Sequence, residues 1–234
     1  MKRILPLLLL FICLSGFTQT IDLTKYDDFL KRHVSAKGVV NFDKVLKNIE
    51  ELNSITQNFS KISPNKGWSK SEYKTFWINF YNANIIKLLA ENYPIKSINY
   101  IVDAFKIDVV DYDGGKISLD FIQHELLRPL GDPRVNFALY ATTISSPMLS
   151  RTAYKPETVE QELEAATINF INDPTKNKID MNASKISKIF EWYKDDFGSE
   201  EAIKHFINKY SGSGKVNQTT NLFYMEYDWN LHRK

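Results

Sequence analysis

The run Phe76-Trp77-Ile78-Asn79-Phe80-Tyr81-Asn82-Ala83 decides the fold of this chain, because it is apolar on nearly every side of one helix. The helix begins with a capping-box signature, Ser69 followed three residues later by Glu72, and it continues to Asn92 before Pro94 stops it. A helix that is apolar all round is packed on several sides. We therefore expect this helix to lie at the centre of the molecule.

Two amide side chains, Asn79 and Asn82, interrupt the apolar run. A buried amide without hydrogen-bond partners costs a few kcal/mol, so both residues must find partners inside the protein. Either they tie the helix to a neighbouring loop, which is the commoner role, or they line a ligand pocket.

Shorter elements surround the central helix. Apolar spacing, capping residues and turn signals predict helices at Thr24–His33, Phe42–Phe59, Ser118–Leu130, Val159–Phe170, Ser184–Asp196 and Glu200–Tyr210. Apolar runs beside turn residues predict a hairpin, Lys106–Asp111 with Lys116–Ser118, and strands at Val135–Ile144 and Leu222–Trp229. Together these elements predict a helix-rich α+β fold with a small antiparallel sheet, in a single domain that covers residues 20–234.

The N-terminus has the three parts of a secretory signal peptide. Lys2 and Arg3 precede an apolar run, Ile4–Leu14, and small and polar residues follow up to Thr20. The run is shorter than the ~20 residues of a membrane-spanning helix, and no stop-transfer pattern follows it. The sequence thus predicts a signal peptide over residues 1–19 rather than a buried core helix, export to the periplasm or out of the cell, and no transmembrane segment.

Loss of the signal peptide changes the composition of the chain. The only cysteine, Cys13, leaves with it, so the mature chain has no disulfide, thiolate nucleophile or cysteine metal site. The formal net charge of +2 falls to about zero because Lys2 and Arg3 are also removed. A balanced chain lacks the basic footprint of nucleic-acid binding. We therefore expect no nucleic-acid partner, and we expect no cofactor.

The segment His124-Glu125-Leu126-Leu127-Arg128 begins like the helix of a zinc protease. Arg128 stands where the second histidine ligand would be, and a cation there would repel zinc, so we expect no metal. The spacing does place His124 and Arg128 on one helical face, with Glu125 beside them. Such a trio either forms a structural ion-pair cluster, the more frequent case, or binds an anion or orients a carboxylate.

Several segments together resemble the domain-of-unknown-function family DUF 547. They are the central run quoted above, Tyr93–Ile98, Ser118–Arg128, Asp132–Leu139, Ile186–Tyr193 and Tyr227–Trp229. Their order and spacing are kept from about Tyr26 to Trp229, and the resemblance implies a shared fold in one domain. It brings no known reaction with it.

The family pattern also carries a histidine before Phe-Ala and two cysteines, the second before a proline. Here Asn136, Ala141 and Ser146 stand at those positions, ahead of Pro147. Either this chain has lost a thiol-dependent property, because neither alanine nor a serine without a base replaces a thiolate, or the cysteines were small buried residues that Ala and Ser replace by ordinary packing.

The pair Asp228-Trp229 ends the resemblance a few residues before the chain ends. We expect Trp229 to be largely buried, docking the last strand on the domain, and Asp228 to be hydrogen-bonded nearby.

Two functions are compatible with these features. The first is a non-catalytic binding or interaction module for an unknown small molecule or envelope component. Its polar groove would be formed around Asn79, Asn82, His124, Glu125 and Arg128. The alternative is a cell-envelope hydrolase or transferase that uses His124 and Glu125 as acid and base, since proton transfer needs no cysteine.

Overall fold

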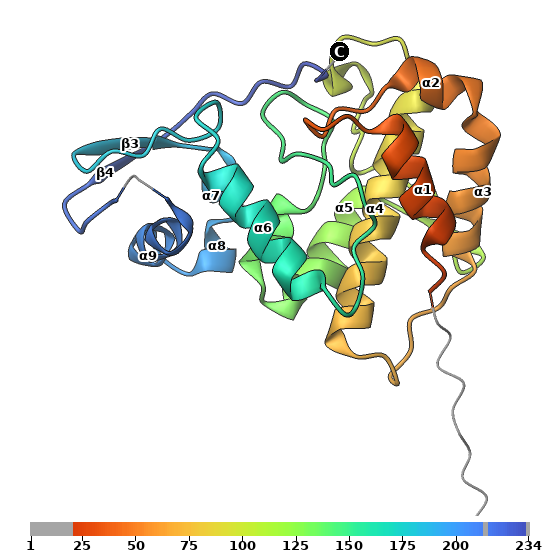
Figure 1. Ribbon diagram of the computed structural model, residues 1–234, viewed down its shortest axis with the longest axis horizontal. Coiled ribbons are helices and arrows are strands. Elements are labelled where there is room, and N and C mark those ends of the chain that lie inside the picture. Colours follow the sequence, from red (N-terminus) through yellow and green to blue (C-terminus); the bar gives the residue numbers. More distant parts are fainter. Residues whose placement is uncertain (1–20, 213–214, 233–234) are drawn as a thin grey trace, which may run out of the picture.

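The computed structural model describes residues 21–212 and 215–232, so the predicted signal peptide and Cys13 lie outside the described residues (Figure 1). The longer helices are α1 (Thr24–His33), α2 (Phe42–Lys47), α3 (Ile49–Ser60), α4 (Lys70–Asn92), α6 (Val159–Ile171) and α9 (Glu200–Tyr210). The shorter helical segments are η1 (Ile98–Tyr100), α5 (Leu119–Phe121), η2 (Ile122–Leu127), η3 (Arg128–Leu130), η4 (Pro133–Phe137), α7 (Ile189–Trp192) and α8 (Lys194–Phe197). Two ribbons hold the strands: β1 (Val110–Tyr112) is antiparallel to β2 (Gly115–Ile117), and β3 (Ala183–Ile186) is parallel to β4 (Asn221–Tyr224). The predicted helix-rich α+β class is confirmed.

Helix α4 is the central helix that the sequence predicts, and it packs against α2 and α3 as well as against α5, η2 and α6 (Figure 1). Its capping box is formed: the Glu72 backbone N–H donates to Ser69 Oγ (3.2 Å), and the Ser69 N–H donates to the Glu72 carboxylate (2.7 Å). Every residue from Lys74 to Ile86 is buried. The helix therefore has no solvated face over this stretch.

The amides of α4 tie the helix to two loops, which is the commoner of the two roles considered. Asn79 Nδ2 donates to the Tyr154 carbonyl (2.8 Å), and the Tyr154 N–H donates back to Asn79 Oδ1 (3.0 Å). Asn82 Nδ2 donates to the Ala138 carbonyl (2.9 Å), and the Tyr140 N–H donates to Asn82 Oδ1 (2.9 Å). Each amide thus pairs with one backbone C=O and one backbone N–H of a loop, as the backbone of a neighbouring strand would.

The segment from Val135 to Tyr140 is buried as predicted, but it is not a strand, and the predicted buried run is wrong at its end, where Ile144 is 40% exposed. Asp132 caps the short helix η4 by accepting a hydrogen bond from the Arg134 N–H (3.1 Å), and irregular backbone follows Phe137. A continuous apolar run reports burial, not backbone conformation. Here the Ala138 carbonyl and the Tyr140 N–H pair with the Asn82 side chain and not with a neighbouring strand.

Among the predicted helices, α1, α6 and α9 are confirmed, and two others are interrupted. The helix predicted over Phe42–Phe59 is divided at Asn48, whose backbone leaves the helical region (φ −130°) and separates α2 from α3. The segment Ser118–Leu130 is helical throughout, but it passes from α5 to the π-helix η2 and then to the 3₁₀ helix η3, which contains Pro129.

The C-terminal part differs most from the prediction. Ser184–Asp196 does not form one helix: its first residues belong to β3, and α7 and α8 follow. The last strand ends at Tyr224, not at Trp229. The sheet prediction is right for the antiparallel hairpin β1–β2 but wrong for β3–β4, which is parallel. Alternating burial along β3, with Ser184 and Ile186 inside, marks it as a strand, and the helix prediction overlooked this alternation.

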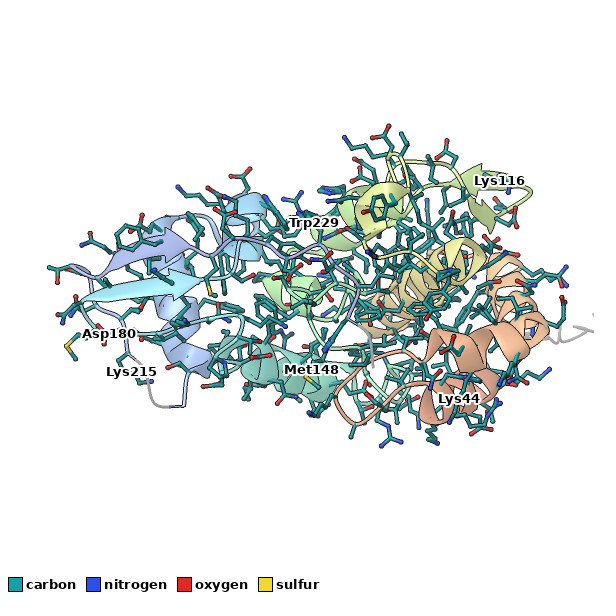
Figure 2. All side chains as sticks on the ribbon, turned by 90° about the horizontal axis from the view of Figure 1, so that it is seen from above. Lys44, Lys116, Met148, Asp180, Lys215 and Trp229 are labelled. Atoms are coloured by element: carbon teal, nitrogen blue, oxygen red, sulfur yellow. The ribbon has the colours of Figure 1, made fainter. Side chains whose placement is uncertain are left out.

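The buried apolar side chains form two clusters. The larger surrounds α4, and the smaller lies between α6, α9, β3 and the residue Phe137. Figure 2 shows the two parts side by side, with Lys44 and Lys116 at one end, Asp180 and Lys215 at the other, and Trp229 between them.

An ion network joins α4, η4 and α6. Lys74 Nζ lies 2.6 Å from an Asp132 oxygen and 2.9 Å from a Glu160 oxygen, and Arg134 binds both carboxylates. Burial alone would raise the pKa of Asp132, but the hydrogen bonds and charges of Arg134 and Lys74 outweigh it and lower that pKa to about 2. Asp132 therefore stays ionised and keeps the network closed at neutral pH.

The Asn82 pairing leads to a prediction about stability. Asn82→Ala leaves the Ala138 carbonyl and the Tyr140 N–H buried without partners, so the free energy of unfolding should fall by about 2 to 4 kcal/mol. Asn84→Ala is the matched control, because the Asn84 amide donates only within its own helix, to Phe80 O. Urea unfolding of the mature chain measures both. Equal losses in the two variants would show that the loop is held by other contacts.

Candidate functional site

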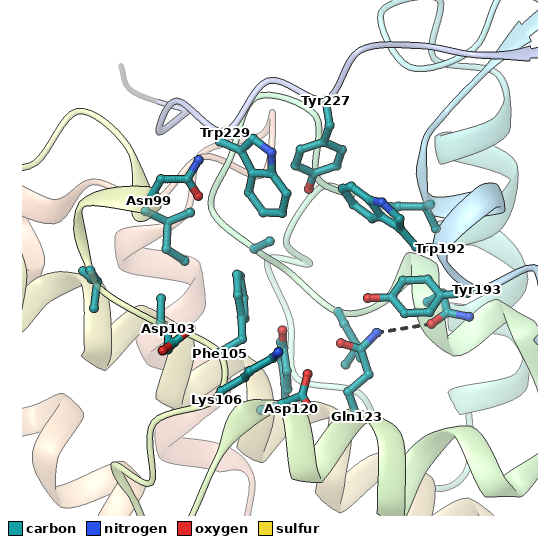
Figure 3. A pocket seen from close by; sticks show the side chains of 18 of the residues that line it. Asn99, Asp103, Phe105, Lys106, Asp120, Gln123, Trp192, Tyr193, Tyr227 and Trp229 are labelled. Carbon is teal, nitrogen blue, oxygen red and sulfur yellow. Dashed lines mark hydrogen bonds between the residues drawn. The ribbon is translucent and has the colours of Figure 1, made fainter.

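A cavity of about 730 Å³ opens where the two apolar clusters meet (Figure 3). One side is built by the loop Ile98–Lys106 and by Asp120 and Gln123 on successive turns of α5 and η2. The other side is built by α7 and by the C-terminal segment Tyr227–Trp229. Its volume lies within the range of about 300 to 1,000 Å³ that is typical of small-molecule sites.

Three rings, which we call the aromatic wall, cover one side of the cavity: Trp192, Tyr227 and Trp229. Their centroids lie 4.7 Å apart for Trp192 and Tyr227, 5.4 Å for Trp192 and Trp229, and 4.4 Å for Tyr227 and Trp229. Trp229 is partly buried and packs against the larger apolar cluster, whereas Trp192 beside it is 40% exposed. Both indoles line the cavity, because the apolar core does not cover them completely.

Hydrogen bonds to two distant loops position the C-terminal segment. Ser97 Oγ donates to the Trp229 carbonyl (2.8 Å), the Asp228 N–H donates to Ser145 Oγ (2.9 Å), and Thr143 Oγ1 contacts the Tyr227 hydroxyl (3.0 Å). The Asp228 carboxylate accepts from the backbone and side chain of Asn230, so its expected hydrogen bonding is confirmed. Two backbone hydrogen bonds and the contact to the Tyr227 hydroxyl thus fix the two rings of the aromatic wall that come from the C-terminal segment.

The floor of the cavity is polar and uncharged. Tyr81, on α4, is 3% exposed, and Tyr193 follows α7. Burial raises the pKa of Tyr81, Tyr193 and Tyr227, so all three phenols keep their protons at neutral pH and both donate and accept hydrogen bonds. Gln123 Nε2 donates to Asn136 Oδ1 (3.3 Å), which leaves the Gln123 carbonyl oxygen turned toward the cavity (Figure 3).

The predicted trio lies behind this floor. Arg128 is held by Asp196 through two hydrogen bonds from Nε (2.8 and 3.0 Å), and its Nη1 contacts His124 Nδ1 (2.7 Å). An arginine only donates, so His124 Nδ1 accepts and Nε2 carries the proton toward Asp120 Oδ1, 3.4 Å away. Glu125 is exposed and pairs with no residue that the structure describes.

The five predicted site residues therefore do not form one groove. His124 and Arg128 meet in an ion-pair cluster, whereas the two asparagines tie loops to α4 and Glu125 points to solvent. The lining of the cavity includes none of the five within the described chain. Sequence analysis missed the residues that do line it, among them Asn99, Asp103, Lys106, Asp120, Gln123, Trp192, Tyr193 and Tyr227. One signal was available: several of them stand inside the motifs that carry the family resemblance.

The positions that depart from the family pattern gather at the same cavity. Asn136 and Ala141 line it, and so does Pro147. Ser146, just before Pro147, is buried and donates its hydroxyl to the Thr143 carbonyl (2.9 Å). Positions 136 and 141 thus face one space, and position 146 lies at its edge.

Backbone strain marks the same segment. Thr142 is fully buried and adopts a left-handed conformation (φ 61°), which a β-branched residue rarely does. Such strain costs about 1 to 3 kcal/mol and collects at functional sites. It reverses the chain between Ala141, which lines the cavity, and Thr143, which contacts Tyr227.

Residues 21–212 and 215–232 contain no group of three or more His, Cys, Asp or Glu side chains that could hold a metal ion. Within the same residues, no helix has the length and apolar character needed to cross a membrane.

The fold and cavity define a helix-rich α+β protein with an aromatic-walled site of small-molecule size. Residues 65–171 match the family described as protein of unknown function, DUF547, which confirms the resemblance over this segment. The matched segment contains α4, the cavity loop, α5 and η2, and positions 136, 141 and 146, whereas α7 and the C-terminal segment lie outside it. No curated protein and no solved structure matches the chain.

Thiols placed at the departing positions should distinguish a lost site from simple packing. In Ala141→Cys, we expect rapid labelling by a maleimide in the folded protein, because Ala141 lines the cavity and is partly exposed. Ser146→Cys should react slowly, because Ser146 is 3% exposed. Adding Asn136→His to Ala141→Cys should speed labelling at neutral pH if the imidazole favours the thiolate. Ala165→Cys, at an exposed position of α6, is the reference, and a thiol at 141 that stays inert would support packing.

Proposed function

We propose that this protein is an exported binding module whose small-molecule or envelope-derived ligand occupies the aromatic-walled cavity. The observation that carries the proposal is the cavity itself, which sets an aromatic wall opposite Asp120 and Gln123 (Figure 3). Small-molecule sites combine apolar and aromatic walls with a few placed polar groups in this way. The N-terminal sequence supports export, because its basic, apolar and small-polar parts follow one another as in a signal peptide.

A second candidate is acid–base catalysis on envelope material. The observation in its favour is the contact between His124 Nε2 and Asp120 Oδ1 (3.4 Å), because Asp120 lines the cavity. The acid beside His124 in this version is Asp120, since Glu125 is exposed and stands away from the cavity lining.

The cavity proposal is tested by variants of Gln123 on η2 and Trp192 on α7, with Glu125 on η2 as the control. We expect ligands found in a thermal-shift screen of sugars, amino acids, nucleosides and quaternary amines to lose their effect in Gln123→Ala and Trp192→Ala. They should keep it in Glu125→Gln, whose side chain does not line the cavity. Ligands that ignore the cavity variants but need His124 or Glu125 would move the site to the predicted trio. Conversion of a bound ligand by wild type but not by His124→Gln would favour catalysis.

Export has a direct test. Expression of the full chain in a Gram-negative host, followed by fractionation and N-terminal sequencing, should yield a periplasmic or secreted protein that begins between Gly16 and Ile21. Replacement of Leu8 and Leu9 by Asp should break the apolar run and keep the chain in the cytoplasm. A cytoplasmic wild-type protein that retains Met1 would contradict the export proposal.

A further inference from the structure

We propose that the cavity binds a neutral saccharide, with one pyranose ring stacked on the aromatic wall and its hydroxyl groups bonded to the polar groups opposite. This inference rests on the proposed function and adds the chemical class of the ligand. It follows from the spacing of the three rings, the protonation of the floor and the charges on the rim.

The aromatic wall is a stacking surface and not a cage. A cage for a cation needs rings that stand apart around the charge, within about 6 Å of each ring centre. The rings of Trp192, Tyr227 and Trp229 contact one another, with centroids 4.4 to 5.4 Å apart, so no ion fits between them. Their planes are tilted against one another by 30° to 51°, so they offer the faces of individual rings, and the negative potential of such a face attracts the C–H groups on the apolar face of a sugar ring.

The groups across the cavity suit hydroxyl partners. Tyr81 and Tyr193 are protonated phenols, as is Tyr227 at the edge of the wall itself, and each phenol both donates and accepts, as a sugar hydroxyl does. The Gln123 oxygen and the Asn99 amide add planar acceptors and donors at two edges of the space (Figure 3). Tyr227 already contacts Thr143, and Tyr193 is hydrogen-bonded to Gln123, but a phenol can make more than one hydrogen bond, so each can still pair with a ligand hydroxyl.

Charge argues against an anionic ligand. The charged side chains in the lining are Asp103, Lys106 and Asp120, so acids outnumber bases. Arg128, which lies behind the floor, is already occupied by Asp196 (2.6 Å). A phosphate or a free carboxylate would therefore meet net repulsion, whereas a neutral polyhydroxyl compound would not.

Calorimetry and tryptophan fluorescence on the mature chain test the inference with defined compounds. The saccharides are the tetramers of β-linked N-acetylglucosamine, β-linked glucose, α-linked glucose and β-linked xylose, and choline chloride and sodium phosphate are the comparison compounds. We expect at least one saccharide to bind and to quench or shift the indole emission. Its affinity should fall at least tenfold in Trp192→Ala and in Trp229→Ala, with partial recovery in Trp192→Phe, which keeps a stacking ring.

The matched control is Phe223→Ala, which removes an exposed aromatic side chain on β4, away from the cavity lining, and should leave affinity unchanged. Thermal melting of each variant checks that the fold is kept, and Trp192→Ala serves alone if Trp229→Ala unfolds. The inference is overturned if no saccharide binds, or if binding persists in Trp192→Ala. If choline or phosphate binds instead and requires Gln123, the cavity remains the site and only the saccharide class fails. If no compound of any class depends on the cavity residues, the proposed function fails as well.

Discussion

The pairing between the Asn82 side chain and the backbone of residues 138 and 140 is the interaction on which the site depends. Helix α4 is buried all round, so a polar group inside it must be satisfied by protein, and the loop supplies both partners. The helix is rigid, and the loop is therefore fixed at this point. This fixed point also positions the residues that follow. Ala141 lines the cavity, and Thr143 and Ser145 contact the C-terminal segment.

Thr142 lies between the residues that pair with Asn82 and the residues that contact the C-terminal segment. A β-branched residue in the left-handed region is unfavourable, but the surrounding hydrogen bonds hold it there. The His232 N–H donates to the Thr142 carbonyl (2.8 Å), and the Thr142 hydroxyl donates to the Ala141 carbonyl (2.6 Å). The hydrogen bonds to Asn82 on α4 precede Thr142 in the sequence, and the hydrogen bond from His232 in the C-terminal segment is made to Thr142 itself. The strain is thus maintained by contacts far apart in the sequence, and the same contacts bring the aromatic wall to face α5 and η2.

The sequence predicted the elements whose pattern is local and long. Helix α4 has a capping box and many turns of apolar residues, and α1, α6 and α9 have clear spacing, so these were found. Most of the segment 135–144 was placed in the core correctly, although Ile144 is exposed, but its backbone conformation was predicted wrongly, because a side-chain amide from α4 takes the role of a neighbouring strand. No local pattern can report a partner that lies more than fifty residues away.

The site was harder to predict for a related reason. The trio of His124, Glu125 and Arg128 attracted attention because charged residues carry recognisable chemistry, yet two of them serve an ion-pair cluster. The cavity is built from ordinary residues, such as Trp192 and Trp229, that separate segments bring together. That Asn136, Ala141 and Ser146 stand where the resemblance implies histidine and cysteines was visible in the sequence, but that Asn136 and Ala141 face one cavity was not.

Hydrogen bonding around the cavity favours binding over catalysis. A general base needs a free lone pair directed at its proton. The Nδ1 lone pair of His124 is occupied by Arg128, which two bonds to Asp196 hold in place, so the Nε2 side of the imidazole can only donate. To act as a base, His124 would have to break from Arg128 and leave a partly buried guanidinium short of one partner. The phenols nearby hold their protons because burial raises their pKa, and the amides do not titrate. Apart from Asp103, Lys106 and Asp120, the polar side chains of the lining are phenols, amides and indoles that keep their protons at neutral pH, which supports the proposed binding site.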